Sequence, residues 1–404
     1  MSDSTDVLKK ALAKAHPNLL DALSKFQEIE LHDVELEVDE LELVLPQMVT
    51  SVAKLVEEAA AEKPSQLLQE RFIAPPTKYN AQIIEVKLGA TKAEGGSRDR
   101  TLTIGGETYP PFQTVSQPIK NMPVISLDVF DTKIPLAKPV KMHFSEVLED
   151  PTAWAKLAVE KFDAEMINLH LVSIDPMVKD TPPAEASKTV ENVLQAVKVP
   201  VAIGGCGDAQ KDLDVFTKVA EMAKGERLLF NSVTLDMDIK KMAKAVKDNG
   251  HATIAFTPMD MNKARELNRK LFELLPREQI VIDTTTAALG YGLDYAFTTM
   301  ERTRLAGLMG DPELVQPMAS GTTNAWAARE AWMKMPPEWG PTELRGPIWE
   351  TVTALTLLLA GVDYFMMMHP AAVKTVKDTI HNLASGKKLA PNQYDWVRLR
   401  NLGD

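Results

Sequence analysis

Cysteine is nearly absent from this sequence, which has a single thiol, Cys206, among 404 residues. One thiol excludes a disulfide framework, and it also excludes a cysteine-ligated zinc site or iron–sulfur cluster held by this chain alone. Such sparing use of cysteine is typical of a reducing compartment and predicts a cytoplasmic location. The opening residues MSDSTDVLKKALAKAHP contain no apolar segment of the kind that a signal peptide requires.

Basic residues are outnumbered, with 45 Lys and Arg against 56 Asp and Glu and a formal net charge of −11 at pH 7. This charge argues against DNA or RNA as a partner, because binding to phosphates needs a basic face. The one long hydrophobic run, residues 351–368, is interrupted by Gly361 and Asp363. We expect a buried helix followed by a buried strand there, and no membrane span.

Common catalytic motifs are missing as well. The sequence has no His-Glu-x-x-His zinc motif, no Gly-x-Ser-x-Gly nucleophile motif and no Gly-x-Gly-x-x-Gly nucleotide-binding motif after a strand. The run Gly204-Gly-Cys-Gly207 matches the last motif only in part, and a tight turn between a strand and a helix explains it better. We therefore assign no catalytic residue and no metal ligand.

From about residue 120 the chain alternates short apolar runs with amphipathic runs. The apolar runs are rich in Val, Ile, Leu, Phe and Met and show little polar alternation, which is typical of parallel strands buried on both faces. These predicted strands are residues 124–130, 166–173, 199–205, 227–234, 251–257, 279–285, 314–320 and 363–369.

Helical periodicity fills the intervals between these strands. Apolar residues recur every three or four positions in residues 151–162, 184–197, 212–223, 238–249, 262–275 and 294–309. Eight strands with intervening helices over about 260 residues match the count and length of a (β/α)8 TIM barrel, an α/β fold. An open doubly wound sheet is the alternative, and the missing nucleotide-binding motif argues against it.

The first 120 residues have a different pattern. Residues 4–26 and 47–62 are predicted to be helical, and 29–45 alternates apolar with acidic residues, as a strand with one acidic face would. Residues 81–91 and 100–107 flank a Gly-Gly-Ser-Arg turn and predict a β-hairpin that covers the N-terminal end of the barrel. The expected division is an acidic α+β extension over 1–80, the hairpin and a linker over 81–119, the barrel over 120–386 and a C-terminal tail over 387–404.

Ligands of such barrels bind at the loops that follow the strands. After the sixth strand come residues 283–286, Asp-Thr-Thr-Thr, and then the turn Gly290-Tyr-Gly292; after the seventh come residues 320–324, Ser-Gly-Thr-Thr-Asn. Hydroxyls, glycines and methionines outnumber nucleophiles there, which favours a broad, mostly apolar macrocycle with amide side arms. Met318 and Met366–Met368 would form an apolar platform for it, or they are ordinary core residues.

Acidic residues near the strand ends have two interpretations. Asp175, Asp260 and Asp283 would act as general acids or substrate clamps, or they would cap the helices that follow. The isolated histidines His170, His251 and His369 are better explained as packed or hydrogen-bonded side chains than as ligands.

Several long motifs are similar to those of a known family. They are KLGATKAEGGSRDRTLTIGGE (87–107), HLVSIDPMVKDTPPAEASKTVENVLQAVKVPVAIGG (170–205), DMNKARELNRKL (260–271), TTTAALGYGLDYAFTTMERTRLAGLMGD (284–311), SGTTNAWAAREAW (320–332), LRGPIWE (344–350) and FMMMHP (365–370). They resemble the delta subunit of the acetyl-CoA decarbonylase/synthase complex, the archaeal counterpart of the small subunit of the corrinoid iron–sulfur protein. The resemblance extends over residues 81–385 and does not include the first 80 residues.

The resemblance implies a barrel that pairs with a large (gamma) subunit, which contributes the [4Fe–4S] cluster and a corrinoid-binding domain. It implies that a cobalamin-type corrinoid lies between that domain and the C-terminal face of this barrel. It also implies that the cobalt carries a methyl group between a methyl-tetrahydropterin and acetyl-CoA synthase. Acetyl-CoA synthase and a methyl-tetrahydropterin methyltransferase would then be transient partners.

On this resemblance, residues from three strand ends are expected to line the corrinoid. They are Thr284, Thr285, Thr286, Ala287, Leu289, Gly290, Tyr291, Gly292, Met318, Ser320, Gly321, Thr322, Thr323, Asn324, Met368 and His369. A bulky residue in place of Thr286 is expected to reduce corrinoid retention by the heterodimer. Asp175 and Asp283 are further candidates.

Two other functions stay open at this point. A pterin-dependent corrinoid methyltransferase on the same fold would bind its pterin with strand-end acids and amides, a set that Asp128, Asn168, Asp175 and Asn231 could supply. A purely architectural subunit would use the acidic extension for assembly, although a solvated acidic face explains the same residues equally well.

Overall fold

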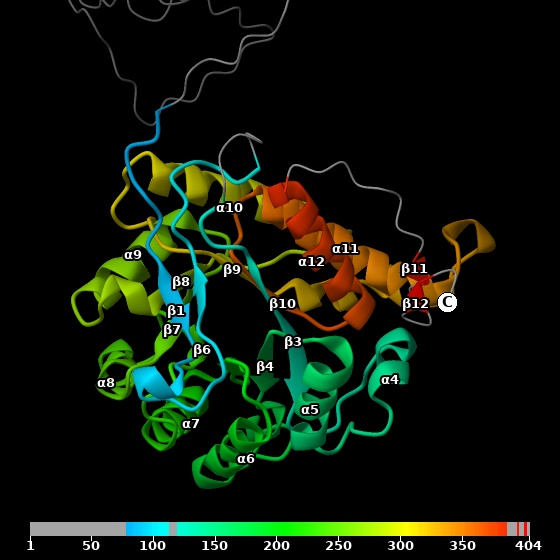
Figure 1. The fold of residues 1–404 in the computed structure, drawn as a ribbon, viewed down its shortest axis with the longest axis horizontal. Helices are drawn as coiled ribbons and strands as arrows, with labels where there is room; N and C mark the ends of the chain where they lie inside the picture. Colours follow the sequence, from blue (N-terminus) through cyan, green and yellow to red (C-terminus); the bar gives the residue numbers. More distant parts are fainter. Residues whose placement is uncertain (1–77, 113–118, 386–393, 396–399, 402–404) are drawn as a thin grey trace, which may run out of the picture. The chain divides into compact units, whose positions relative to one another are not determined.

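The structure is a computed structural model that describes residues 78–112, 119–385, 394–395 and 400–401 (Figure 1). The helices expected over 4–26 and 47–62 and the acidic strand expected over 29–45 lie outside the described residues, as does most of the expected tail. The described residues belong to one compact unit, Thr77–Asp404.

Eight parallel strands form the central sheet, in the order β8-β7-β6-β5-β4-β3-β10-β9. They are β3 (Val124–Phe130), β4 (Met166–His170), β5 (Val201–Gly204), β6 (Leu229–Val233), β7 (Ala252–Phe256), β8 (Ile280–Asp283), β9 (Ala319–Ser320) and β10 (Tyr364–Met367). The two ends of this order meet, because the Ile282 N–H donates to the Pro317 carbonyl over 2.8 Å and Ile282 pairs in parallel with Met318. The sheet is therefore a closed barrel, which confirms the eight predicted strands and excludes the open alternative.

Helices cover the outside of the barrel (Figure 1). They are α4 (Lys138–Phe144), α5 (Pro151–Phe162), α6 (Pro183–Ala196), α7 (Ala209–Met222), α8 (Ile239–Asn249), α9 (Met261–Phe272), α10 (Leu293–Leu308), α11 (Thr342–Leu359) and α12 (Pro370–Ser385). Short 3-10 helices are η2 (Lys92–Glu94), η3 (Val172–Ile174), η4 (Arg277–Gln279), η5 (Thr322–Ala327), η6 (Arg329–Ala331) and η7 (Pro337–Trp339), and β11 (Tyr394–Asp395) pairs with β12 (Arg400–Asn401). All six predicted helices are present, and the hydrophobic run 351–368 is the end of α11 followed by β10. In the described part of the chain, no helix combines the length and hydrophobicity that a membrane span needs.

Aspartate residues begin several of these helices. Asp150, Asp208 and Asp238 accept backbone N–H groups in the first turns of α5, α7 and α8. Asp260 accepts the N–H groups of Asn262 and Lys263 over 2.8 and 3.2 Å at the start of α9. Of its two interpretations, the helix cap is therefore the one that the structure supports for Asp260; such a cap stabilises a helix by about 1 kcal/mol.

A β-hairpin closes one end of the barrel. Its strands β1 (Val86–Leu88) and β2 (Leu102–Ile104) pair antiparallel. Val86, Leu88 and Ile104 are fully buried, and they form one hydrophobic cluster with residues at the start of the barrel strands, among them Val124 and Met166. In Figure 1 the hairpin crosses in front of the strands. The predicted hairpin and its position over the N-terminal end of the barrel are confirmed.

Arg98, in the turn of this hairpin, attaches it to the helical layer. Its guanidinium donates to the carbonyls of Val197 and Leu194 over 2.7 and 2.8 Å and pairs with Glu226 over 2.8 Å. The turn needs glycine at position 96, because a Cβ on Gly96 would lie 2.3 Å from a backbone oxygen. The Gly-Gly-Ser-Arg sequence is therefore a tight turn that directs a buried arginine inward.

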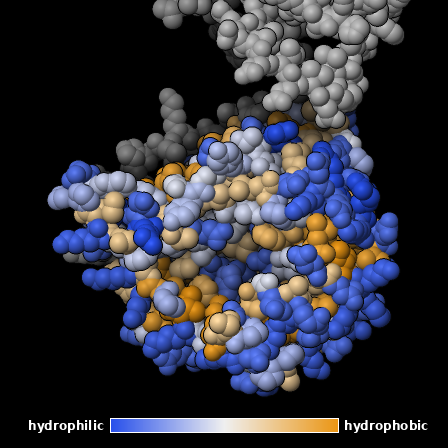
Figure 2. All heavy atoms as spheres, turned by 180° about the vertical axis from the view of Figure 1, so that it is seen from behind, coloured by the Kyte–Doolittle hydropathy of each residue, from blue (hydrophilic) through white to orange (hydrophobic). Residues whose placement is uncertain are grey.

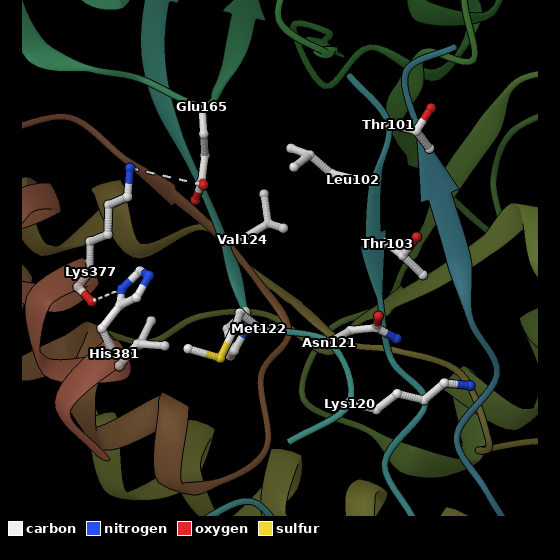
Figure 3. Close-up of a pocket in the computed structure, with 12 residues that line it drawn as sticks. Thr101, Leu102, Thr103, Lys120, Asn121, Met122, Val124, Glu165, Lys377 and His381 are labelled. Carbon is white, nitrogen blue, oxygen red and sulfur yellow. Dashed lines mark hydrogen bonds and ion pairs between the residues drawn. The ribbon is translucent and has the colours of Figure 1, made fainter. Parts of the chain in front are cut away.

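A hollow of about 340 Å³ lies at the hairpin end, between β2, the start of β3 and α12 (Figure 3). Lys377 Nζ lies 4.0 Å from a Glu165 carboxylate oxygen, and His381 Nδ1 donates to the Lys377 carbonyl over 2.8 Å. Lys120 Nζ pairs with Glu85 over 2.9 Å. Because these polar groups pair with one another, the hollow is a junction between α12 and the hairpin.

Candidate functional site

The loops after the strands open onto the face opposite the hairpin. Figure 2 shows the molecule from that side, and its surface is hollowed near the centre, with hydrophilic residues inside and hydrophobic residues around the hollow. Exposed hydrophobic side chains on these loops include Met177, Met259 and Tyr291. This face therefore has a polar centre and a partly apolar rim.

A chain of hydroxyl groups joins the loops after β8 and β9. Thr286 Oγ1 lies 2.9 Å from Ser320 Oγ, which in turn lies 2.9 Å from Thr322 Oγ1. The Asn324 side-chain amide donates to the Thr286 carbonyl over 3.0 Å. The structure thus brings the two predicted binding segments, 284–292 and 320–324, together, and it uses part of their hydroxyl groups to hold them there.

Burial divides the predicted lining residues into two groups. Those that are buried are Thr284, Thr286, Met318, Ser320, Thr322, Met368 and His369. Those that solvent reaches, wholly or in part, are Thr285, Ala287, Leu289, Gly290, Tyr291, Gly292, Gly321, Thr323 and Asn324. In the arrangement shown, a ligand on this face would contact the second group.

Left-handed backbone conformations shape the loop after β8. Thr285, Gly290 and Gly292 have φ angles of 76°, 80° and 91°, which explains the two glycines of the turn, because this region favours glycine. Thr285 is β-branched and adopts it at a cost in strain. Hydrogen bonds from its N–H to Asp283 Oδ1 (2.7 Å) and from its hydroxyl to the Thr257 carbonyl (2.9 Å) hold it there.

Met318 and Met368 do not form an exposed apolar platform. They are 1% and 6% exposed and belong to the hydrophobic core between the barrel and its helices. Strand alternation turns Ala319, next to Met318, toward the barrel interior, and Met318 therefore faces the helices. Met366 is also buried, in the barrel interior. The core interpretation of these methionines is the one that the structure supports.

Glu350 of α11 organises the end of β10. Its carboxylate oxygens accept the N–H groups of Met368 and His369 over 2.5 and 3.0 Å. The His369 ring is 1% exposed, accepts the Ala371 N–H over 3.1 Å and stacks on Trp326 at 5.9 Å. Burial lowers the pKa of His369 to about 3. The side chain is therefore a neutral, packed histidine, as its sequence context predicted.

Unpaired polar atoms lie near the strand ends. The Thr257 and Thr284 hydroxyls and Asn168 Oδ1 are buried without a hydrogen-bonding partner among the residues that the structure describes. Asp283 is 5% exposed, and burial raises its pKa to about 7 against the opposing hydrogen bond from the Thr285 N–H. Buried polar groups without partners cost free energy, and a ligand or water in the mouth of the barrel would satisfy them.

A polar cluster lies inside this mouth. Asp128 of β3 is fully buried, and its Oδ1 accepts the Asn168 amide N–H over 2.9 Å and lies 3.2 Å from His170 Nε2. Its Oδ2 accepts the Thr323 hydroxyl. Asn168 and His170 stand two positions apart on β4, so their side chains leave the same face of the strand. The cluster therefore connects the barrel interior to the loop after β9.

The set proposed for pterin binding is brought together only in part. Asp128 and Asn168 are hydrogen-bonded, and the Asn231 side-chain amide contacts a methionine sulfur of β10 over 3.3 Å in the barrel interior. Asp175 is elsewhere, in an exposed turn where its carboxylate accepts the Met177 N–H over 2.7 Å. The helix-cap interpretation does not describe Asp175, because the helix that follows begins only at Pro183.

Sequence reasoning assigned no role to Glu350 and no link between Asp128 and Thr323. A signal for Glu350 existed, since it is the only charged residue in the run from Gly346 to Val362. An isolated charge in an apolar helix is either paired or functional. The Asp128–Thr323 bond joins residues 195 positions apart, and local patterns carry no signal for such a pair.

Comparisons with known proteins identify the family. The family model described as CO dehydrogenase/acetyl-CoA synthase delta subunit matches residues 85–336. The acetyl-CoA decarbonylase/synthase complex subunit delta of Archaeoglobus fulgidus is 52% identical over 346 residues, which are 83% of this chain and 76% of that protein. That of Methanocaldococcus jannaschii is 43% identical over 392 residues, which are 94% of this chain and 96% of that protein. The chain belongs to the delta-subunit family of acetyl-CoA decarbonylase/synthase complexes.

The family match confirms the resemblance seen in the sequence motifs. The match also extends beyond the residues that carry the resemblance. The alignment with the Methanocaldococcus jannaschii protein covers 94% of this chain and therefore includes part of residues 1–80. The N-terminal extension, which matched no known motif, is therefore shared in part with the delta subunit of Methanocaldococcus jannaschii.

Among solved structures, this delta-subunit chain is similar to dihydropteroate synthases. That of Yersinia pestis with a sulfonamide drug complex has a TM-score of 0.47 at 12% identity and covers 66% of this chain and 95% of that chain. That of Thermus thermophilus has a TM-score of 0.43 at 14% identity and covers 73% of this chain and 96% of that chain.

Proposed function

We propose that this chain covers one side of a cobalamin-type corrinoid that it shares with the large (gamma) subunit of a corrinoid iron–sulfur protein. When bound, the cobalt of that corrinoid carries a methyl group between a methyl-tetrahydropterin and acetyl-CoA synthase. The observation that carries the proposal is the joining of loops 284–292 and 320–324 on the face opposite the hairpin. The relatives that share this chain's sequence are named as subunits of an acetyl-CoA decarbonylase/synthase complex.

The accessible residues of the two loops fit a macrocycle with amide arms. Leu289 and Tyr291 offer apolar surface. The hydroxyls of Thr285 and Thr323 and the amide of Asn324 donate within the protein, but their oxygens can still accept hydrogen bonds at the same face. The chain would bind and orient the ring and exclude water from one side of it. The corrinoid-binding domain and the cluster would come from the large subunit, and acetyl-CoA synthase and a methyl-tetrahydropterin methyltransferase would be transient partners.

Introducing a negative charge at exposed positions of the loop after β8 tests the proposal. We expect Leu289→Asp and Tyr291→Asp to lower the cobalt content and the corrinoid absorbance of the copurified delta–gamma pair at least about tenfold, because each places an unpaired carboxylate against an apolar ring. Met309→Asp is the matched control, since Met309 is 63% exposed at the other end of α10. Full cobalt content in both loop variants would contradict the proposal.

Thr286, singled out from the sequence, is a poorer test position. It is 4% exposed, and its hydroxyl is bonded to Ser320. A bulky residue there would disturb the packing of both loops, and a loss of corrinoid would not distinguish contact from misfolding.

A second candidate function is pterin binding, which the buried Asp128–Asn168–His170 cluster favours. A carboxylate and an amide inside a barrel mouth suit the fused, hydrogen-bonding ring system of a pterin. Asn168 Oδ1 is buried and has no partner among the described residues. On this alternative the chain would hold methyl-tetrahydropterin and take part in transferring its methyl group to the corrinoid.

Binding of tetrahydropterin to the purified chain, measured by calorimetry, tests this alternative. Asp128→Asn is expected to weaken binding about tenfold or more, because a hydrogen bond to a charged group contributes about 1.5–3 kcal/mol. Asp99→Asn is the control, since Asp99 lies between the two hairpin strands at the other end of the barrel and its side chain is 44% exposed. A wild-type chain that binds no tetrahydropterin would exclude the alternative and leave the corrinoid proposal untouched.

A further inference from the structure

The outer face of α11 is apolar, whereas surface helices usually turn a polar face outward. Ile348, Val352 and Leu359 are 41%, 37% and 56% exposed, and Leu355 is partly buried. These four residues follow one another at intervals of four, three and four positions. That spacing is the alternation of d and a positions in a heptad, which places the side chains along one seam of a helix.

Charge is missing from this seam. Of the charged residues of α11, Arg345 and Glu350 are buried and Glu343 lies in the first turn. After Glu350 the helix continues as TVTALTLLL without a charge. By contrast, the outer face of α8 exposes Lys240, Lys241, Lys244 and Lys247. The face of α11 therefore resembles an interface, whereas the face of α8 resembles an ordinary solvated surface.

A hollow of about 690 Å³ lies beside this seam, between the start of α10 and α11. From the α10 side, both apolar residues (Leu289, Leu293, Phe297) and polar ones (Asp294, Thr298) line it, and Thr356 lines it from α11. Figure 1 shows α10, α11 and α12 as neighbours on one side of the barrel. Thr356, which lines the hollow, follows Leu355 of the seam directly in the sequence of α11.

We propose that an amphipathic helix of another subunit of the acetyl-CoA decarbonylase/synthase complex packs along this seam of α11. The heptad spacing fits a helix, because knobs at a and d positions insert between the side chains of a facing helix. The absence of charge requires that the facing side of that helix be apolar and uncharged. Its residues pack between Ile348 and Leu359. This inference rests on the chain being a subunit of such a complex, and it holds whether or not the chain binds a corrinoid.

Two other segments could bury the same seam of α11, and the test distinguishes them from a helix of another subunit. One is a second copy of this chain, which would pair α11 with α11. The other is residues 386–404 of the same chain, which follow α12, the other neighbour of α11. A helix of another subunit is favoured because the relatives of this chain are named as subunits of a complex.

The test uses the full complex coexpressed from its own subunits. A Val352→Glu/Leu359→Glu variant is expected to weaken association of this chain with the other subunits at least about a hundredfold, because each buried apolar contact at an interface centre contributes about tenfold or more. Lys240→Glu/Lys247→Glu on α8 is the matched control and is expected to leave association unchanged. Because Val352 and Leu359 are exposed, both variants should fold, and the thermal midpoint of the isolated chain checks this.

A photo-crosslinking residue at position 352 identifies the occupant. The expected crosslink joins α11 to a helical, apolar segment of another subunit. A crosslink to residues 386–404 or to a second copy of this chain would overturn the proposal, as would wild-type association of the charged variant. Association is measured with and without added cobalamin, so a failure to retain corrinoid, which bears on the proposed function, stays separate from a failure of this interface.

Discussion

Replacing Arg304 with methionine is expected to lower the free energy of unfolding by about 3–5 kcal/mol. Arg304 of α10 is 2% exposed, and its guanidinium donates from Nε to the Gly361 carbonyl over 3.2 Å and from Nη2 to the Asp363 carboxylate. Asp363 also accepts the Met318 N–H over 2.7 Å. Removal of the guanidinium would leave a buried carboxylate without its cation, and this is the costly case for a buried ion pair.

The position of this pair explains why the loss should affect the whole barrel. The Met318 carbonyl accepts the N–H groups of Asp363 and Tyr364 over 2.8 and 3.1 Å, so the pair lies where β9 meets β10. Glu107, which follows the hairpin, lies 3.7 Å from Arg304, and burial followed by the Asp363 charge raises its pKa to about 8. Arg304 lowers that pKa, so its loss should raise the pKa of Glu107 further and keep Glu107 protonated.

Denaturant unfolding of the wild-type and variant proteins measures this effect. Arg269→Met is the matched control, because Arg269 pairs with Glu313 over 2.6 Å with its side chain 61% exposed, and an exposed pair contributes about 0–1 kcal/mol. Adding Asp363→Asn to Arg304→Met should recover part of the loss, since it removes the unpaired charge. Equal destabilisation by Arg304→Met and Arg269→Met would show that the buried pair has no special role.

The barrel strands could be predicted because their sequence signal is local. A strand buried on both faces is a continuous apolar run, and each predicted run contains one observed strand. The seventh strand shows the limit of this reasoning: residues 314–320 were predicted, whereas β9 is only Ala319–Ser320. Pro317 interrupts the ladder, because proline has no N–H to donate to a neighbouring strand.

The sequence predicts which two segments form the candidate site, but it does not predict which of their side chains face solvent. Residues 284–292 and 320–324 were found because hydroxyls and glycines gather after two strands, and both do meet at one face. Which hydroxyls face solvent depends on pairs such as Thr286–Ser320, which are 34 positions apart. Neither composition nor spacing reports such a pair. For the same reason, the sequence does not predict the hydrogen bond between Asp128 and Thr323.

Glu350 shows how a single side chain can make the stability of the end of β10 depend on pH. We expect the wild-type protein to lose about 2–3 kcal/mol of unfolding free energy between about pH 6 and about pH 9 through this group, and Glu350→Gln to lose none of it. Glu350 is fully buried, and burial raises its pKa from 4.5 to about 8, although the N–H groups of Met368 and His369 oppose the shift. The folded protein therefore keeps a proton that the unfolded chain has released.

The sign of the effect follows from that retained proton. The stability contributed by Glu350 is fully present below the unfolded pKa of 4.5 and is lost as the pH rises through the folded value of about 8. Asp283 and Glu107, whose pKa values burial raises to about 7 and about 8, titrate in both proteins, so the difference between the two unfolding curves isolates Glu350. Glu273→Gln, at an exposed position, is the control and should keep the wild-type dependence. If Glu350→Gln instead loses stability in parallel with the wild type, Glu350 is ionised in the fold, and its two backbone hydrogen bonds outweigh its burial.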